Sequence, residues 1–325
     1  MTTLTRSHMD VFQEQGYVVV KGLLSWELDL APVVDEYSRL LGRLAAKWHK
    51  EGRLSQTFSG LPFGQRLTRI MGEVPPSEVI QHLDISLPQS NIAEDTPFHF
   101  GPAVFNLLRS PRLLDAVEEF IGPEILSNPI QHVRIKPPER LLPKDALGNS
   151  LVAKTSWHQD LGVGLAEADR SNILTVWFPL TEATVENGCL VTVPGSHEGE
   201  LALHCLRSPK QNGLHIPDQY LGPNQTPVPM SPGDVYFMHT KTMHSSLPNN
   251  SDTIRWSFDI RYQPIGHPTG RPFFPGFVAR SRARPETELH DAAEWRLRWE
   301  EVRSNLARNE TPTFRRWRLD DPRCA

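Results

Sequence analysis

The stretch MSPGDVYFMHTKTMHSSLPNNSDTIRWSFDIRYQP, residues 230–264, decides the fold. Two runs rich in β-branched and aromatic residues, 234–239 and 254–264, flank a polar loop, which predicts two strands of a sheet. Similar runs lie upstream between turn clusters such as ENG and PGSH, at 130–136, 173–180 and 189–193. The sequence therefore predicts a mainly β protein with flanking helices, built around a double-stranded β-helix (jelly roll, cupin-like).

Helices are expected on both sides of these strands. Residues 26–48 and 104–122 carry apolar residues at helical spacing, and Gly122 is a typical C-terminal cap. Residues 49–100, rich in Pro, Ser and Gly, are expected to be irregular. A last helix over 288–309 would place on one face Trp295, Trp299, Val302 and Leu306.

Length and composition fit one globular domain over residues 1–325, of which 38 % are apolar and 22 % charged. We expect a helical N-terminal part at 1–125 and the jelly-roll core at 126–265. A C-terminal extension with a helix would follow at 266–325.

Charge, hydropathy and cysteine content argue against a nucleic-acid-binding, membrane-spanning or disulfide-rich protein. The net charge of −4 gives no electrostatic reason to expect nucleic acid or an anionic membrane as a partner. No apolar run approaches the ~18 residues that span a bilayer, and the N-terminus lacks the apolar stretch of a signal peptide. Cys189, Cys205 and Cys324 are widely spaced, so neither a disulfide framework nor a thiolate zinc site is predicted. We expect a cytoplasmic protein.

The segment SWHQDLGVG, residues 156–164, places His158 and Asp160 two positions apart. In an extended segment these side chains point to the same side, where an imidazole and a carboxylate can bind one metal ion. A hydrogen-bonded surface pair is the competing interpretation, because H-x-D is a short motif that recurs at His82. We expect His82 and His99 to be loop histidines, since both lie in the irregular stretch.

Two downstream histidines compete to complete this site. Either His239 or His244, added to His158 and Asp160, gives the two-histidine, one-carboxylate set that suits Fe(II) and leaves coordination positions open. The residues alone leave both histidines as candidates, and Arg255 lies eleven residues after His244, early in the next strand.

Arg255 shares a strand face with Ser257, Asp259 and Arg261, because these positions alternate along the strand. A buried arginine is costly unless it holds an anion such as a carboxylate. The alternative is an ion pair of Asp259 with Arg255 or with Arg261.

Several motifs follow one another in a specific order along most of the chain. They are FQEQGYVVVKGLL, SPRLLDAVEEFIGPEI, KPP, WHQD, LTVWFPLTEATVENGCLVTVPGSH, PGDVYFMHTKTMHSSLPNNSD and RYQP. Together they resemble the phytanoyl-CoA dioxygenase-like family of iron(II)/2-oxoglutarate-dependent oxygenases. The resemblance implies Fe(II), with 2-oxoglutarate and O2 as co-substrates. It also implies that 2-oxoglutarate yields succinate and CO2 while a C–H bond of a small-molecule substrate is oxidised.

The resemblance also assigns roles to individual residues. It implies that His158, Asp160 and His244 are the iron ligands, whereas His239 is structural. Arg255 matches the arginine that binds the distal carboxylate of 2-oxoglutarate. Further co-substrate contacts implied by the resemblance are Ser246, Trp177 and Gln131.

The family also narrows the reaction and the substrate. Halogenating branches replace the carboxylate ligand by Gly or Ala, so Asp160 favours hydroxylation, desaturation or ring closure. Relatives tailor secondary metabolites, which favours a small natural product, with a coenzyme A thioester as the alternative substrate.

A metalloenzyme without 2-oxoglutarate and a non-catalytic binding protein are the competing functions. Residues 139–155 are interpreted equally well as a lid or as an inert loop, and 198–230 is a second insertion.

Overall fold

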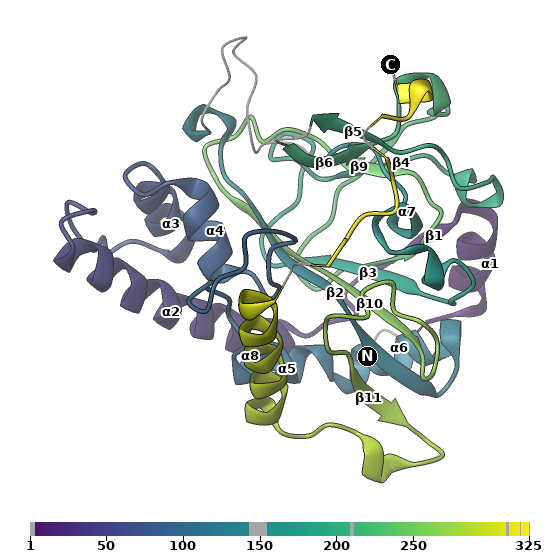
Figure 1. Cartoon of the computed structure of the whole chain (residues 1–325), viewed down its shortest axis with the longest axis horizontal. Helices are drawn as coiled ribbons and strands as arrows, with labels where there is room; N and C mark the ends of the chain where they lie inside the picture. Colours follow the sequence, from purple (N-terminus) through teal and green to yellow (C-terminus); the bar gives the residue numbers. More distant parts are fainter. Residues whose placement is uncertain (1–3, 143–154, 209–210, 310–311, 319, 325) are drawn as a thin grey trace.

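A six-stranded antiparallel sheet lies at the centre of the computed structural model, which describes residues 4–142, 155–208, 211–309, 312–318 and 320–324 (Figure 1). Its strands are hydrogen-bonded in the order β1-β8-β3-β10-β2-β11. Their bounds are Tyr17–Val20 (β1), Val235–His239 (β8), Leu174–Pro179 (β3), Arg255–Pro264 (β10), Glu124–Lys136 (β2) and Phe277–Ser281 (β11).

A second layer of strands faces this sheet. It contains a three-stranded sheet in the order β7-β4-β9 and a two-stranded sheet of β5 and β6. Their bounds are Thr226–Val228 (β7), Leu190–Thr192 (β4), His244–Ser246 (β9), Cys205–Ser208 (β5) and Gln211–His215 (β6). Antiparallel sheets stacked in this way form a jelly roll, so the predicted fold class is confirmed.

Cross-strand pairing separates the two faces of the large sheet. Trp177 in β3 pairs with Tyr236 in β8 and with Asp259 in β10, so these three side chains share the inner face. The inner face packs against the second layer in an apolar cluster that includes Leu190 and Val228. The outer face packs against the helices in a larger cluster that includes Val176, Phe178, Phe237 and Phe258.

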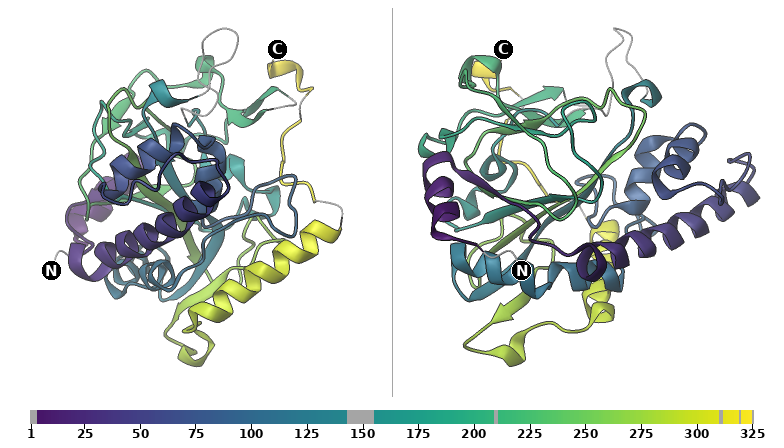
Figure 2. Two further views of the ribbon diagram at one scale, coloured as in Figure 1. Left: turned by 90° about the vertical axis from the view of Figure 1, so that its left-hand side faces the viewer. Right: turned by 180° about the vertical axis from the view of Figure 1, so that it is seen from behind.

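Helices cover the outer face of the large sheet and extend beyond its edge (Figures 1 and 2). The prediction for 104–122 is confirmed, because Gly122 ends α6 with φ 86° and its N–H bonds to Glu118 at 2.9 Å. A π-helical turn, Trp26–Leu30, precedes α2, which agrees with the prediction for 26–48. The helices are Arg6–Gln15 (α1), Ala31–Lys50 (α2), Phe63–Met71 (α3), Pro76–Leu83 (α4), Pro102–Leu108 (α5), Pro111–Ile121 (α6), Asp160–Val163 (α7) and Ala292–Arg308 (α8).

The helices α3 and α4 show that the expectation of an irregular stretch at 49–100 was wrong. Helix α3 begins directly after Pro62, and α4 has Pro76 in its first turn. Proline is well tolerated in the first turn of a helix, because its missing N–H would have no helical partner there. These prolines therefore mark helix starts, although in the sequence they indicate loops.

Strands from all three expected parts of the chain contribute to the large sheet. β1 comes from the N-terminal part and pairs with β8, and β11 comes from the C-terminal extension and pairs with β2. Helix α8 buries Trp295, Trp299 and Leu306, with Val302 packed beside them, which confirms the predicted face.

A disulfide joins Cys205 in β5 to Cys324, across 119 positions of sequence, and Cys189 is a buried free thiol. The sequence did not predict this bond, because cysteines so far apart carry no spacing signal. The disulfide ties the C-terminal segment to the second layer of strands.

No helix among the described residues is long and apolar enough to cross a membrane. The segment 139–155, interpreted as a lid or as an inert loop, falls mostly on residues 143–154, which lie outside the described residues. The insertion at 198–230 carries β5, β6 and β7.

Candidate metal centre

His158, Asp160 and His244 converge inside the jelly roll. Nε2 of His158 lies 3.5 Å from Oδ1 of Asp160, and Nε2 of His244 lies 3.9 Å from the same oxygen. The two rings are 4.1 Å apart between centroids, because His158 and His244 form an antiparallel β-bridge. All three candidate ligand atoms lie within 4.8 Å of one another. Two imidazoles and one carboxylate at such separations fit a single divalent metal ion.

The histidine tautomers also fit a metal. Nδ1 of His158 bonds to the carbonyl of Ser156 at 2.8 Å, and Nδ1 of His244 bonds to that of Thr242 at 3.0 Å. A carbonyl can only accept, so each Nδ1 must carry the proton. Each Nε2 then keeps its lone pair directed at Asp160, which is the form that a metal requires. Burial, followed by the charge of His158, lowers the pKa of His244 to about 4, so its ring is neutral at neutral pH.

Asp160 begins the single-turn helix α7, so the extended backbone considered for His158 and Asp160 ends at Gln159. Its Oδ1 accepts a hydrogen bond from Nη2 of Arg261 at 2.6 Å, and its Oδ2 accepts one from the hydroxyl of Thr175. Burial alone would raise the pKa of Asp160, but Arg261, His158 and His244 together hold it well below its usual value. The carboxylate is therefore ionised and fixed in orientation.

The two histidines and Arg255 line the same cavity in the jelly roll. Its lining also includes Thr175, Trp177 and Leu190. Arg134 and Asp259 line the same cavity, and the Arg134 side chain is 47 % exposed. The cavity therefore approaches the surface beside Arg134.

Arg255 is only 2 % exposed, yet no carboxylate among the described residues forms an ion pair with it. Its Nη1 donates to Oγ of Ser257 at 2.6 Å, its Nε donates to the carbonyl of Gly188 at 3.2 Å, and its guanidinium lies 5.5 Å from the ring centroid of Trp177. Burial, followed by the charge of Arg134, lowers the pKa of Arg255 to about 10, so it remains charged at neutral pH. A buried guanidinium in this state favours an anionic ligand.

The alternative prediction was an ion pair of Asp259 with Arg255 or with Arg261, and the structure shows the pair with Arg261. Nη2 of Arg261 lies 3.3 Å from Oδ1 of Asp259 and simultaneously bonds to Asp160. Because Asp259 is paired with Arg261, the guanidinium of Arg255 is available to bind an anionic ligand.

Ser246 lies in β9, two residues after His244, and is 1 % exposed. Its Oγ accepts hydrogen bonds from Nζ of Lys136 at 2.7 Å and from the N–H of Thr155 at 3.3 Å. Lys136 pairs with Arg255 across β2 and β10. The Ser246 hydroxyl is thus held by Lys136, which lies beside Arg255. No motif in the sequence pointed to this lysine.

Gln131, a co-substrate contact implied by the resemblance, is not among the residues that line this cavity. Its Nε2 donates to the carbonyl of Ile85 at 2.9 Å. Neighbouring odd positions of β2, Val133 and Ile135, pack in the cluster beneath the helices, whereas Arg134 faces the cavity. Gln131 therefore contacts the helical layer, to which Ile85 belongs.

The other histidines have structural contacts. His82 lies in α4 rather than in a loop, with its ring 5.5 Å from that of Trp48. His99 bonds through Nε2 to Glu36 at 2.9 Å. His239 ends β8 and accepts from the N–H of Lys241. His197 lies in a single 3-10 turn, Ser196–Glu198, and its Nε2 donates to the carbonyl of Gln13.

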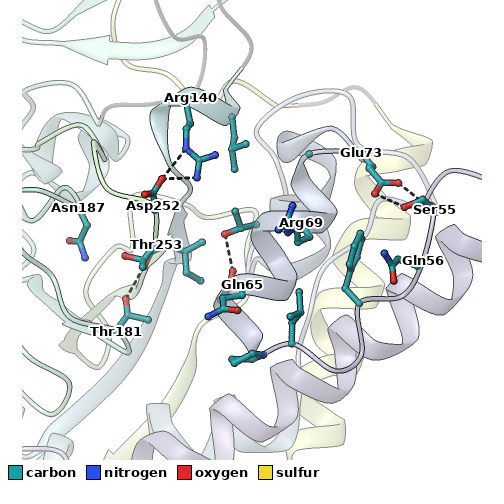
Figure 3. Close-up of a pocket in the computed structure, with 18 of the residues that line it drawn as sticks. Ser55, Gln56, Gln65, Arg69, Glu73, Arg140, Thr181, Asn187, Asp252 and Thr253 are labelled. Carbon is teal, nitrogen blue, oxygen red and sulfur yellow. Dashed lines mark hydrogen bonds and ion pairs between the residues drawn. The ribbon is translucent and has the colours of Figure 1, made fainter.

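Figure 3 shows a wider groove between α3 and the ends of β3 and β10. Arg140 and Asp252 form an ion pair at 2.7 Å on its rim. None of the three candidate metal ligands lines this groove, so it is separate from the metal site.

Comparison with known proteins supports the same chemistry. The family model of phytanoyl-CoA dioxygenase (PhyH) matches residues 12–257. A Caenorhabditis elegans protein named "Probable phytanoyl-CoA dioxygenase" is 28 % identical over 266 residues, which cover 71 % of this chain and 81 % of that protein. Human peroxisomal phytanoyl-CoA dioxygenase is 24 % identical over 265 residues, 80 % of this chain and 68 % of that protein.

Solved structures show the same fold. EvdO2 from Micromonospora carbonacea var. aurantiaca, complexed with 2-oxoglutarate, superposes with a TM-score of 0.55 and 21 % identity, covering 89 % of this chain and all (100 %) of that one. The apo non-heme monooxygenase ThoJ gives a TM-score of 0.58 at 17 % identity, covering 91 % of this chain and 95 % of that one. With the family match extending over most of the sequence, the chain belongs to the phytanoyl-CoA dioxygenase family and is an iron(II)- and 2-oxoglutarate-dependent dioxygenase that uses O2 as its further co-substrate.

Proposed function

We propose that His158, Asp160 and His244 hold Fe(II), and that Arg255 binds the distal carboxylate of 2-oxoglutarate. The observation that carries this proposal is one cavity lined both by two histidines of the candidate metal site and by a buried arginine that has no carboxylate partner among the described residues. The Trp177 ring beside the guanidinium would limit where the co-substrate can lie.

When bound, Fe(II) supplies the redox chemistry that couples decarboxylation of 2-oxoglutarate to oxidation of a C–H bond. The side chains around it have simpler tasks. Arg261 keeps the Asp160 carboxylate ionised, and its hydrogen bonds with Arg261 and Thr175 hold it in one orientation. Leu190 and Trp177 provide apolar walls, which keep water away from the reacting groups.

We further propose that the primary substrate is a small organic molecule of secondary metabolism that enters beside Arg134 and is hydroxylated or otherwise oxidised. Arg134 is the most exposed of the charged residues that line the cavity, and Nε of Arg134 lies 3.6 Å from Oδ2 of Asp259. Both side chains can hydrogen-bond to a polar substrate. Changing Arg134 to Ala is expected to raise the KM for the primary substrate while leaving that for 2-oxoglutarate nearly unchanged.

An acyl-CoA thioester is the second candidate substrate. It is supported by the names of the C. elegans and human relatives, which are phytanoyl-CoA dioxygenases. Turnover of an acyl-CoA, with no turnover of the free acid, would favour this candidate over a natural product.

The central experiment is anaerobic addition of Fe(II) and 2-oxoglutarate, followed by visible spectroscopy for the weak charge-transfer band. The wild-type protein should develop the band at equimolar iron. His158→Ala should not develop it at all, and Arg255→Ala should need far more 2-oxoglutarate. Candidate substrates are then added to the anaerobic complex, and a true substrate should shift the band. A wild-type protein that binds iron but gives no band with saturating 2-oxoglutarate would contradict the proposed co-substrate site.

A further inference from the structure

The C-terminal segment of the chain crosses the short helix that carries Asp160. We call residues 312–318 and 320–324 the C-terminal strap. Nε1 of Trp317 donates to the carbonyl of Gly162 at 2.7 Å, and Nη1 of Arg316 donates to that of Leu161 at 3.4 Å. Arg316 also forms an ion pair with Asp169, in which its Nη2 lies 2.8 Å from Oδ2. The strap therefore binds the backbone directly after Asp160.

His204 holds the backbone on the other side of Asp160. Its Nε2 accepts a hydrogen bond from the N–H of Gln159 at 2.9 Å, while its Nδ1 donates to the carbonyl of Ala202 at 2.8 Å. Burial lowers the pKa of His204 to about 4, so the ring is neutral at neutral pH and Nε2 can accept. The same ring stacks on Trp317, with centroids 5.0 Å apart and an angle of 25° between planes.

Gly162 allows this close packing. A Cβ at position 162 would lie 2.5 Å from the His204 ring, so no larger residue fits there without displacing the ring. His204 and Trp317 thus clamp the backbone at positions 159 and 162, on both sides of Asp160. Because α7 has only four residues, it cannot be stable by itself and depends on such contacts.

The disulfide connects the two halves of this clamp. Cys205 directly follows His204, and Cys324 lies in the strap that carries Trp317. Cys205 is buried and Cys324 is partly exposed, so a reductant can approach from the strap side. The family match ends at residue 257, so the strap lies outside the part of the chain that defines the family.

We propose that His204 and Trp317 are positioning residues for Asp160, and that the Cys205–Cys324 disulfide keeps Trp317 in place, which makes metal affinity depend on the redox state of this bond. The proposal rests on the proposed function only in taking Asp160 as a metal ligand. A dithiol reductant supplies the two electrons: the S–S bond breaks, two protein thiols form with two protons, and the reductant closes to its own disulfide. The strap is then held by non-covalent contacts alone.

The test is an anaerobic titration with Co(II), which reports both affinity and ligand geometry through its visible spectrum. The proteins are the oxidised wild type, the wild type after reduction, alkylation and desalting, and the variants Cys324→Ser and Trp317→Leu. Reduction and both variants should weaken Co(II) binding by about ten- to a hundred-fold, the usual effect of removing groups that orient a metal ligand. They should also alter the Co(II) spectrum and speed amide exchange at 159–163. Trp317→Phe, which keeps the ring but loses the hydrogen bond to Gly162, should recover part of the affinity.

Arg318→Ala is the matched control, because Arg318 lies in the strap but its ion pair is with Asp320 of the same strap. It should bind Co(II) like the wild type. Unchanged Co(II) affinity and unchanged exchange at 159–163 after reduction and in Trp317→Leu would overturn the inference. If even the oxidised wild type failed to bind Co(II), the proposed metal site itself would be wrong. Reduction needs no substitution, so the test does not depend on the folding of the variants.

Discussion

Nη2 of Arg261 lies 2.6 Å from Oδ1 of Asp160, the same oxygen that faces Nε2 of both His158 and His244. Nη1 of Arg261 donates to the carbonyl of Ile130 at 3.0 Å, so the guanidinium is fixed at two points. Both partners of the pair are almost fully buried. In the protein without metal, the charge of Asp160 is therefore balanced mainly by Arg261.

Arg261→Leu should strongly destabilise the metal-free protein. Removing one partner of a buried ion pair leaves the other charge without compensation and costs about 3–5 kcal/mol. Urea unfolding should show this loss, and Mn(II) should restore more stability to the variant than it adds to the wild type, because the metal replaces the missing cation.

The control for that measurement is Arg296→Leu, which removes an exposed pair with Glu300 within helix α8. An exposed pair of this spacing is worth about 0.3–0.5 kcal/mol, so its loss should be barely measurable. Equal stabilities of Arg261→Leu and wild type without metal would show that Arg261 does not balance Asp160.

Single substitutions of His158, Asp160 or His244 by Ala should each abolish stoichiometric Fe(II) binding, measured under anaerobic conditions. His82→Ala should bind Fe(II) normally, because its ring packs against Trp48 in the helical layer. Loss of iron from His82→Ala, with normal binding by His158→Ala, would reverse the assignment of the two H-x-D sequences.

Local patterns in the sequence predicted the main strands, and the resemblance to the family implied the candidate metal ligands, which the structure brings together. β10 was predicted from its alternating residues, and the same alternation placed Arg255, Asp259 and Arg261 on one face. The sequence pattern did not reveal that Arg261 is the residue that bonds to Asp160, because this contact depends on how α7 packs over β3 and β10.

Features that depend on distant contacts were missed. The Cys205–Cys324 bond joins positions with no spacing pattern, and the stacked rings of His204 and Trp317 are likewise far apart in the sequence. Gln131 is a different case: the resemblance implied a co-substrate contact, whereas in the structure its amide donates a hydrogen bond to the carbonyl of Ile85.

His239, the rejected metal ligand, should affect stability in acid rather than metal binding. Burial, followed by the charges of His197 and Lys241, lowers the pKa of His239 to about 4, whereas an unfolded histidine titrates near its ordinary value of 6.5. The unfolded state therefore binds a proton first as the pH falls. The stability linked to His239 is fully present above about pH 6.5 and is lost progressively toward pH 4.

His239→Gln should remove this contribution. Unfolding by urea at several pH values should show a smaller decline between pH 6.5 and 4 for the variant than for the wild type, although His204 and His244 maintain part of the slope. Co(II) affinity at neutral pH should stay the same. A variant with the wild-type pH profile, or one that lost Co(II), would contradict the structural role of His239.

Arg255→Ala should impair the use of 2-oxoglutarate without affecting iron. A hydrogen bond between charged groups contributes about 1.5–3 kcal/mol, which corresponds to an apparent KM for 2-oxoglutarate raised by roughly ten-fold to a hundred-fold or more. The measurement is succinate formation over a range of 2-oxoglutarate concentrations, with anaerobic Fe(II) binding measured in parallel. Arg140→Ala is the matched control, because Arg140 is paired with Asp252 on the rim of the separate groove in Figure 3. An unchanged KM in Arg255→Ala would mean that the buried guanidinium serves the fold through Gly188 and Ser257, and that the distal carboxylate binds elsewhere, with Lys136 beside Ser246 as the next residue to test.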